Sequence, residues 1–216
     1  MVLGIILLII SYLIGSIPFG YLLGKSKGKD IREQGSGNIG STNVTRTLGV
    51  KFGAIAMICD LLKGALIILI VYLLEATTNW NSPFVINGES LYILYGLAAV
   101  VGHVFPVFLK FKGGKAVATT MGAFAVTFPI AALVGLIVFI LLILISGFVS
   151  LASTFGGLVG CITSIILYGG GVLDNQLISS LITIIFVLLI ALRHIENYKR
   201  LLNGTEHSFK KNKHKK

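Results

Sequence analysis

The sequence predicts an all-α integral membrane protein with seven transmembrane helices, an outside N-terminus and a cytoplasmic C-terminus. Three observations predict this class. Of the 216 residues 55% are hydrophobic and only 12% are charged, about half the charged share of a soluble domain, and the mean hydropathy is +0.93. The third observation is that Lys and Arg gather in a few loops. The net charge of +10 therefore indicates loops that face anionic membrane lipids rather than nucleic acid.

The first apolar stretch, residues 1–24, carries no charged side chain. A basic cluster follows it, at Lys25, Lys27, Lys29 and Arg32. A cleaved signal peptide has its positive charge before the apolar stretch, not after it. Residues 1–24 are therefore predicted to be a helix that crosses the membrane inward.

The distribution of basic residues predicts the other crossings. Of eighteen Lys and Arg residues, six lie in 25–51, three in 110–115 and eight in 193–216, whereas the segments 75–89 and 169–176 have none. Under the positive-inside rule the first three segments are cytoplasmic and the last two are outside. The spans predicted between them are residues 53–74, 90–109 and 175–192.

The remaining stretch, residues 116–173, has 58 residues and no charge. It begins inside and ends outside, so it crosses an odd number of times. A single helix of this length would be ~87 Å long against a bilayer core of ~30 Å. Three short spans fit, with breaks at 127–129 and 146–148; five spans in total is the alternative if part is re-entrant. We expect residues 1–209 to form one domain and residues 210–216 to be a basic, disordered cytoplasmic tail.

A glycine-rich motif, GSGNIGSTNVTR, occupies residues 35–46. It fits G-x-G-x-x-G, but no strand precedes it, which disfavours a dinucleotide site. Glycines let backbone N–H groups converge on an anion, and Arg46 adds a bidentate partner for phosphate. The motif predicts a phosphate cradle, with a flexible loop as the alternative. The candidate phosphate-binding residues are Ser36, Gly37, Asn38, Thr42, Asn43 and Arg46.

A second motif, GHVFPVFLKFKGGKAVAT, occupies residues 102–119. Gly113-Gly114-Lys115 resembles the end of a Walker loop, but Ala116 stands where Ser or Thr is required. The motif predicts a basic glycine turn that binds phosphate before a helix. An ordinary positive-inside loop is the alternative. His103 is expected to be a satisfied interfacial histidine or a supporting residue.

Other polar residues stand out in apolar surroundings. His194 and Asn197 are spaced i, i+3 and share a helix face, either as a cap region or as part of a site. Asp60 and Lys63 have the same spacing within a span, where charges are paired with each other or functional. Ser150, Ser153 and Glu196 complete the candidate set, with the serines alternatively bonding their own helix backbone. The cysteines show no metal-ligand spacing, and we expect no metal and no cofactor.

At these motifs the chain resembles a known family, the bacterial acyl-phosphate:glycerol-3-phosphate acyltransferases (PlsY). The similar blocks are residues 36–49, 102–119, 149–153 and 194–209, with D-x-x-K-G at 60–64. The resemblance implies seven helices in the bacterial inner membrane and an active site that faces the cytoplasm. It implies acyl transfer from acyl-phosphate to the sn-1 hydroxyl of glycerol 3-phosphate, giving lysophosphatidic acid and phosphate. It also implies that acyl-CoA and acyl-carrier protein are not used.

The resemblance carries a set of site residues: Ser36, Arg46, Lys115, Ser153, His194 and Asn197. Of these, Lys115, Ser153, His194 and Asn197 are expected to be catalytic. No G-x-S-x-G elbow is present, so we expect direct transfer without an acyl-serine. The proton acceptor is either a substrate phosphate oxygen or His194. Which loop binds which phosphate is left open.

Two other function classes are compatible with parts of the sequence. A transporter of a phosphorylated metabolite would explain charges within a span, but transporter sites lie near the midplane, often between repeats, and no repeat is visible. A non-catalytic membrane scaffold would leave the donor-rich loops unexplained.

Overall fold

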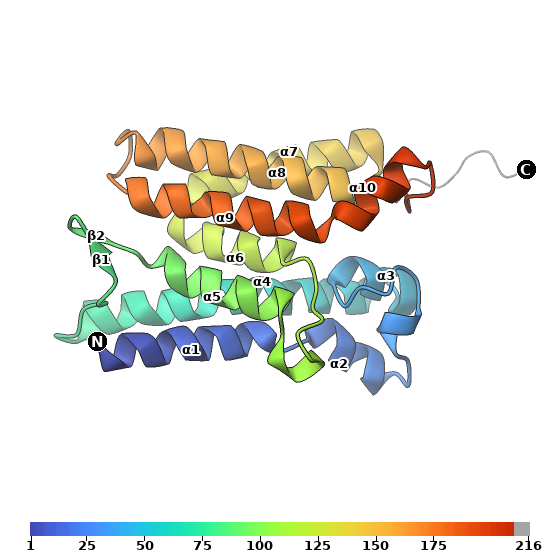
Figure 1. The fold of residues 1–216 in the computed structure, drawn as a ribbon, viewed down its shortest axis with the longest axis horizontal. Coiled ribbons are helices and arrows are strands. Elements are labelled where there is room, and N and C mark those ends of the chain that lie inside the picture. Colours follow the sequence, from blue (N-terminus) through green and yellow to red (C-terminus); the bar gives the residue numbers. More distant parts are fainter. Residues whose placement is uncertain (210–216) are drawn as a thin grey trace, which may run out of the picture. The chain divides into compact units, whose positions relative to one another are not determined.

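The structure is a computed structural model that describes residues 1–209. Within this range the chain is helical apart from its connections and one small β-hairpin (Figure 1). It divides into two compact units: an N-terminal unit, Met1–Thr127, and a C-terminal unit that begins at Phe128. The tail predicted at residues 210–216 lies outside the described residues, and the single-domain expectation stays a prediction.

The first apolar segment is not the continuous helix that the sequence predicted. It consists of α1 (Val2–Ser16) and α2 (Phe19–Ser26), with Pro18 between them. Proline has no backbone N–H and its ring clashes with the preceding turn, so the helix breaks at this point. The two helices together still form an apolar stretch of 25 residues, Val2–Ser26, which is long enough to cross a membrane. At this break the Ile17 carbonyl accepts a hydrogen bond from the side chain of Lys63, which lies on a later helix.

The next elements of the N-terminal unit are a single 3-10 turn, η1 (Ile31–Glu33), and the helices α3 (Ser41–Leu48) and α4 (Val50–Thr77). Gly49 joins the two helices with φ 92°, a backbone conformation that favours glycine. With 28 residues, α4 is ~42 Å long, more than a bilayer core requires.

A short hairpin, β1 (Val85–Ile86) and β2 (Glu89–Ser90), separates α4 from α5 (Ile93–Val104). Next come the 3-10 turn η2 (Val107–Leu109) and α6 (Val117–Thr127).

Glycines let the helices of this unit approach closely: a Cβ on Gly15 of α1 would lie 2.1 Å from the Ala99 carbonyl of α5. Such close backbone contacts are typical of membrane helices. In Figure 1, α1 and α5 accordingly run side by side.

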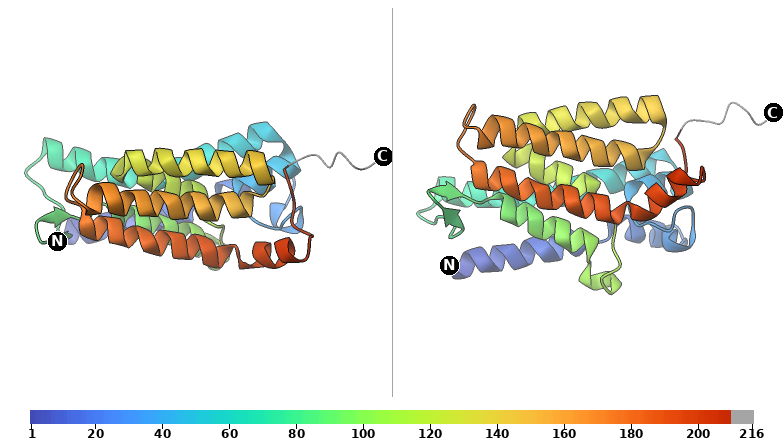
Figure 2. Two further views of the ribbon diagram at one scale, coloured as in Figure 1. Left: turned by 90° about the horizontal axis from the view of Figure 1, so that it is seen from above. Right: turned by 45° about the horizontal axis from the view of Figure 1, so that its top comes forward.

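The C-terminal unit contains α7 (Pro129–Ser146), α8 (Val149–Ser164), α9 (Leu177–Arg193) and α10 (Ile195–Leu202). The last turns of α8 widen into a π-helical segment, η3 (Ile165–Gly169). Helix α8 packs between α7 and α9, as Figure 2 shows. The predicted breaks at 127–129 and 146–148 are confirmed, because α6 ends at Thr127 and α7 ends at Ser146.

Among residues 1–209, four helical segments are long and apolar enough to cross a membrane, or five if the bent pair α9 and α10 counts as one span. The apolar helices α5 and α6 have 12 and 11 residues, only ~16–18 Å of helix. Many of the large apolar side chains, such as Leu73, Leu144 and Leu188, are exposed. This is the surface expected for contact with lipid. The membrane class is confirmed, and the count of seven spans and the orientation stay predictions.

Candidate active site

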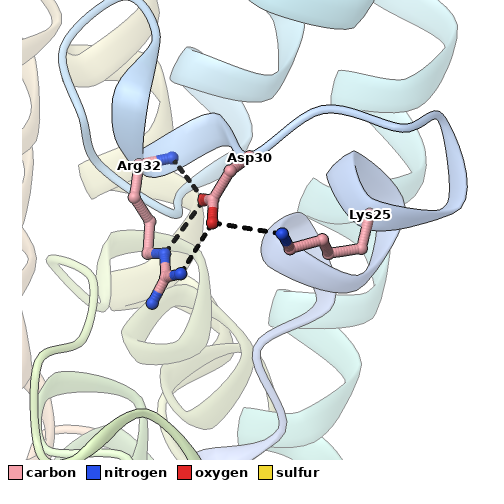
Figure 3. Close-up of polar contacts among 3 residues, drawn as sticks. All are labelled: Lys25, Asp30 and Arg32. Atoms are coloured by element: carbon pink, nitrogen blue, oxygen red, sulfur yellow. Dashed lines mark hydrogen bonds and ion pairs between the residues drawn. The ribbon is translucent and has the colours of Figure 1, made fainter.

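The segment before the first glycine motif is fixed by an ionic cluster around Asp30 (Figure 3). The Asp30 carboxylate accepts hydrogen bonds from Arg32 Nε at 2.9 Å and Nη2 at 2.6 Å, and Lys25 Nζ lies 3.4 Å from Oδ2. The hydrogen bond from Arg32 holds the pKa of Asp30 well below its usual range. The Asp30 carboxylate also accepts from the Arg32 backbone N–H, which starts the turn η1.

The first glycine loop, residues 35–40, is shaped by one buried amide side chain. Asn43 donates from Nδ2 to the carbonyls of Ile31 (2.8 Å) and Gln34 (3.0 Å), and its Oδ1 accepts from the Ser36 backbone N–H (2.9 Å). Gly35 and Gly37 adopt φ 59° and 69°, in the left-handed region where a side chain is costly. Asn43 thus holds the loop in its curved form.

The predicted phosphate ligands are distributed over this loop and α3. Asn38 accepts from the Gly40 N–H at 2.8 Å, which closes a small turn before the first helical residue, Ser41. Arg46 lies on α3 with an exposed side chain. The positive N-terminal end of α3 suits an anion, whereas Arg46 lies in the last turn of the same helix. Of the other predicted ligands in this motif, Ser36 and Gly37 belong to the loop and Thr42 lies in the first turn of α3.

The second glycine loop, residues 110–116, is held by backbone bonds. The Gly113 N–H donates to the Val104 carbonyl (3.1 Å) and the Gly114 N–H donates to the His103 carbonyl (3.0 Å). Lys115 is partly buried, unlike the exposed Lys110 and Lys112. Lys115 therefore differs from the ordinary basic residues of a cytoplasmic loop, and α6 begins two residues after it.

One apolar cluster lies beneath both glycine loops. Its buried members are Ile31, Ile39, Val44 and Ala56, and Leu109 packs against them. The first two flank or belong to the first loop, and Leu109 directly precedes the second. The fold therefore supports both predicted phosphate-binding segments on the same core.

In the C-terminal unit, polar side chains line the start of α8. Ser150 and Ser153 are 1% and 2% exposed. Ser150 Oγ donates to Glu206, and the Thr154 hydroxyl bonds that of Tyr198 on α10. Ser153 Oγ has no hydrogen-bond partner within residues 1–209. A buried hydroxyl without a partner carries a desolvation cost, so Ser153 is a candidate to bond a substrate.

His194 lies at the bend between α9 and α10, and its ring is fixed by the backbone. Its Nδ1 lies 2.8 Å from the Ile190 carbonyl, which can only accept, so Nδ1 is the donor. In the neutral ring Nε2 is then the acceptor nitrogen. His194 is 3% exposed, so this tautomer is set inside the protein.

Glu206 is a functional candidate that the sequence analysis missed. Its carboxylate accepts from Asn197 Nδ2 (2.6 Å) and from Arg200 Nε (2.9 Å), and its side chain is 5% exposed. Glu196, which the sequence analysis named instead, is 70% exposed and pairs with Lys199. Glu206 follows α10 rather than lying on it, so no helical periodicity marked it. The Phe209 N–H donates to the Gly147 carbonyl, which anchors this segment to the unit.

The predicted residues are divided between the two units. The group in the N-terminal unit is Ser36, Gly37, Asn38, Thr42, Asn43, Arg46, Gly113, Gly114 and Lys115, with Asp60, Lys63 and His103 buried in the same unit. The group in the C-terminal unit is Ser150, Ser153, His194 and Asn197, with Glu196 on its surface.

Comparisons with known proteins agree over nearly the whole chain. Residues 5–204 match the family described as glycerol-3-phosphate acyltransferase. Glycerol-3-phosphate acyltransferase 2 of Bacillus anthracis is 45% identical over 204 residues, which cover 94% of this chain and 97% of that protein. The glycerol-3-phosphate acyltransferase of Bacillus subtilis is 41% identical over 202 residues, which cover 93% of this chain and 95% of that protein.

Two crystal structures of the integral membrane glycerol 3-phosphate acyltransferase PlsY (YgiH) are also similar. The glycerol 3-phosphate form is 39% identical with a TM-score of 0.80 and covers 96% of both chains. The lysophosphatidic acid form is 36% identical with a TM-score of 0.81 and covers 96% of this chain and 95% of that one. Fold and comparisons together define an integral membrane acyltransferase of phospholipid biosynthesis.

The chain belongs to the glycerol-3-phosphate acyltransferase family, the PlsY family. This confirms the resemblance found at the sequence motifs. It sets aside the transporter and the scaffold as function classes.

Proposed function

We propose that the protein transfers a fatty acyl group from acyl-phosphate to the sn-1 hydroxyl of glycerol 3-phosphate. The hydroxyl oxygen forms a bond to the acyl carbonyl carbon, and the bond between that carbon and the phosphate oxygen breaks. The products are 1-acyl-glycerol 3-phosphate and inorganic phosphate. Acyl-phosphate has a good leaving group, so modest help from the protein suffices. Similar proteins have been crystallised in glycerol 3-phosphate and lysophosphatidic acid forms, which supports this acceptor and this product.

In this proposal the N-terminal unit binds the phosphate groups. Arg46 and Lys115 neutralise phosphate and the charge that develops as it leaves. Ser36, Gly37, Asn38 and Thr42 contribute donors from the first glycine loop and the start of α3. Asn43, which is buried and bonded to Ile31, Gln34 and Ser36, shapes the loop. Two substrates carry phosphate and the unit has two glycine loops, so each loop takes one phosphate.

The C-terminal unit orients the acceptor in this proposal. The observation that carries it is the buried Ser153 hydroxyl without a partner among the described residues, in the unit where His194 has a fixed acceptor nitrogen. His194 and Asn197 hold the glycerol hydroxyl by hydrogen bonds, and Glu206 holds Asn197. The proton passes to a substrate phosphate oxygen, with His194 Nε2 as the rival acceptor.

The test incubates purified protein in detergent or vesicles with labelled glycerol 3-phosphate and one donor at a time. We expect lipid-soluble label with acyl-phosphate and none with acyl-CoA or acyl-carrier protein. Product formed only from the last two donors would overturn the proposed donor. Trapping of an acyl adduct on Ser153 by mass spectrometry would overturn direct transfer.

We also propose that the protein lies in the bacterial plasma membrane with both glycine loops on the cytoplasmic side. The loops carry the basic residues that the positive-inside rule places there. Single cysteines introduced at Lys112 and at Asn87 would test this with a membrane-impermeant thiol reagent, in a background without the native cysteines. Labelling of the Lys112 site from outside intact cells would contradict the orientation.

A further inference from the structure

A cluster of ionisable side chains is buried among the helices of the N-terminal unit. Lys63 Nζ on α4 lies 2.9 Å from Asp60 Oδ1 on the same helix, and His103 Nδ1 on α5 lies 3.6 Å from the same oxygen. The side chains of Asp60 and Lys63 are 4% and 2% exposed, and that of His103 is 5% exposed. Apolar residues of similar size would often be as stable in such a place, so stability alone does not explain this buried cluster.

One arm of the cluster leads to the first glycine loop. Lys63 Nζ donates to the Ile17 carbonyl at 3.1 Å, the group exposed where Pro18 separates α1 from α2. This hydrogen bond fixes the position of the break and therefore the position at which α2 begins. Gly20 of α2 lies against the loop: a Cβ there would be 2.0 Å from the Ile39 carbonyl. A shift of α2 would therefore move the loop.

The other arm leads to the second glycine loop. The edge of the His103 ring lies against Gly114, where a Cβ would be 2.1 Å from Nε2. The His103 carbonyl also accepts from the Gly114 N–H at 3.0 Å. Gly114 directly precedes Lys115, so the orientation of the His103 ring determines where the loop can lie. Because Nδ1 faces Asp60, the carboxylate orients that ring.

We infer that Asp60, Lys63 and His103 are positioning residues that set the two glycine loops from one shared carboxylate. Lys63 positions the first loop through the Ile17 carbonyl and α2, and His103 positions the second loop through Gly114. Asp60 holds both partners. This inference rests on the proposed function for the role of the loops in phosphate binding. A misplacement of about 1 Å in such a loop is enough to cost ~100-fold in rate.

The first experiment measures hydrogen exchange of the purified full chain in Lys63→Met, His103→Leu and Asp60→Asn. We expect faster exchange at residues 35–40 in Lys63→Met, at residues 110–116 in His103→Leu, and in both segments in Asp60→Asn. The control is Tyr95→Phe, on the same helix as His103, which removes the buried hydrogen bond to Ser82 and should leave both loops unchanged. Unchanged exchange rates in both loops of the three variants would overturn the inference. An equal rise in exchange rate throughout α1–α6 would also overturn it.

The second experiment measures kinetics with both substrates. We expect Lys63→Met to raise KM about tenfold for one phosphate substrate, His103→Leu to do so for the other, and Asp60→Asn to raise both. The conservative variants Lys63→Arg and His103→Asn keep a donor toward Asp60 and should restore most of the affinity, and they serve where the larger changes fail to fold. Conservative variants as impaired as the others would overturn the inference. No transfer by the wild-type protein would instead overturn the proposed function, while the exchange result would still decide on positioning.

Discussion

The two glycine loops of the N-terminal unit, for which we propose the same task of binding phosphate, are held in shape by different contacts. A side chain shapes the first loop: Asn43 bonds three backbone groups from within. The end of a helix shapes the second: Gly113 and Gly114 bond the last carbonyls of α5. Glycine in the first loop supplies left-handed φ, whereas glycine in the second leaves room for the His103 ring. Two similar glycine-rich sequences are therefore held in shape in different ways.

The largest expected effect concerns the cation that the proposal assigns to each loop, which is Arg46 on α3 for the first loop and Lys115 for the second. Arg46→Ala and Lys115→Ala should each lower kcat/KM about 100- to 1,000-fold, the usual cost of removing a group that stabilises developing charge. The controls are Lys51→Ala on α4 and Lys112→Ala, which remove exposed cations close by and should change the rate less than about twofold. Steady-state kinetics of the purified variants measure this. Wild-type turnover in Arg46→Ala would show that the first loop has no role in binding phosphate. Wild-type turnover in Lys115→Ala would show the same for the second loop.

The next effect is specific to the first loop. Asn43→Ala removes the partner of the Ser36 N–H and one of two donors to each of the Ile31 and Gln34 carbonyls. An N–H that stays buried without a partner costs about 1–3 kcal/mol. We expect a lower melting temperature and a loss in kcat/KM of about 100-fold, as for a displaced ligand. Thr47→Ala is the matched control, because the Thr47 hydroxyl bonds only carbonyls of its own helix, α3. Equal effects of the two variants would show that the loop does not depend on its buried amide.

A smaller effect is specific to the second loop. Gly114→Ala places a methyl group against the His103 ring, and overpacking of this kind costs about 1–3 kcal/mol. We expect a loss of about tenfold in kcat/KM if that strain falls on the loop. Gly28→Ala is the control, because Gly28 has φ 69° but open space around it; its cost is in backbone strain alone. A Gly114→Ala protein with normal kinetics would show that the His103 contact does not set the loop.

The smallest effect concerns the approach to the first loop. The hydrogen bond from Arg32 lowers the pKa of Asp30 from its ordinary value of 3.8. The ionised carboxylate therefore stabilises the fold at all pH values above about 4. That contribution is lost as the pH falls from about 4 through the lower folded pKa. The difference in melting temperature between wild type and Asp30→Asn should therefore be constant from pH 5 to 8 and shrink below pH 4. A difference that already changes between pH 6 and 8 would contradict this assignment.

Much of the helix order follows from the sequence, because proline, glycine and charge mark where membrane helices stop. The breaks before Pro129 and at Gly147 were predicted correctly on this basis. The break at Pro18 does not follow from hydropathy, because residues 1–24 are apolar on both sides of it. The hydrogen bond that stabilises the break comes from Lys63, 46 residues away from Ile17.

The candidate site was predictable as a set of residue types but not as a set of contacts. Asn43 reads like a phosphate ligand, yet its amide faces inward to Ile31 and Gln34. Glu196 is nearest to the histidine in sequence, but Glu206 bonds Asn197. Such choices depend on which way a helix turns and where the chain after it returns, and local patterns carry no information on either.

The bend at His194 has a consequence for proton transfer. Its backbone N–H turns to the Ala191 carbonyl at 3.0 Å, and this leaves the Ile190 carbonyl, the acceptor of a regular α-helical turn, to the ring. The course of the main chain thereby decides which ring nitrogen carries the proton. No acidic side chain is needed to choose the tautomer, so substitutions around the ring that preserve the bend should leave the acceptor nitrogen in place.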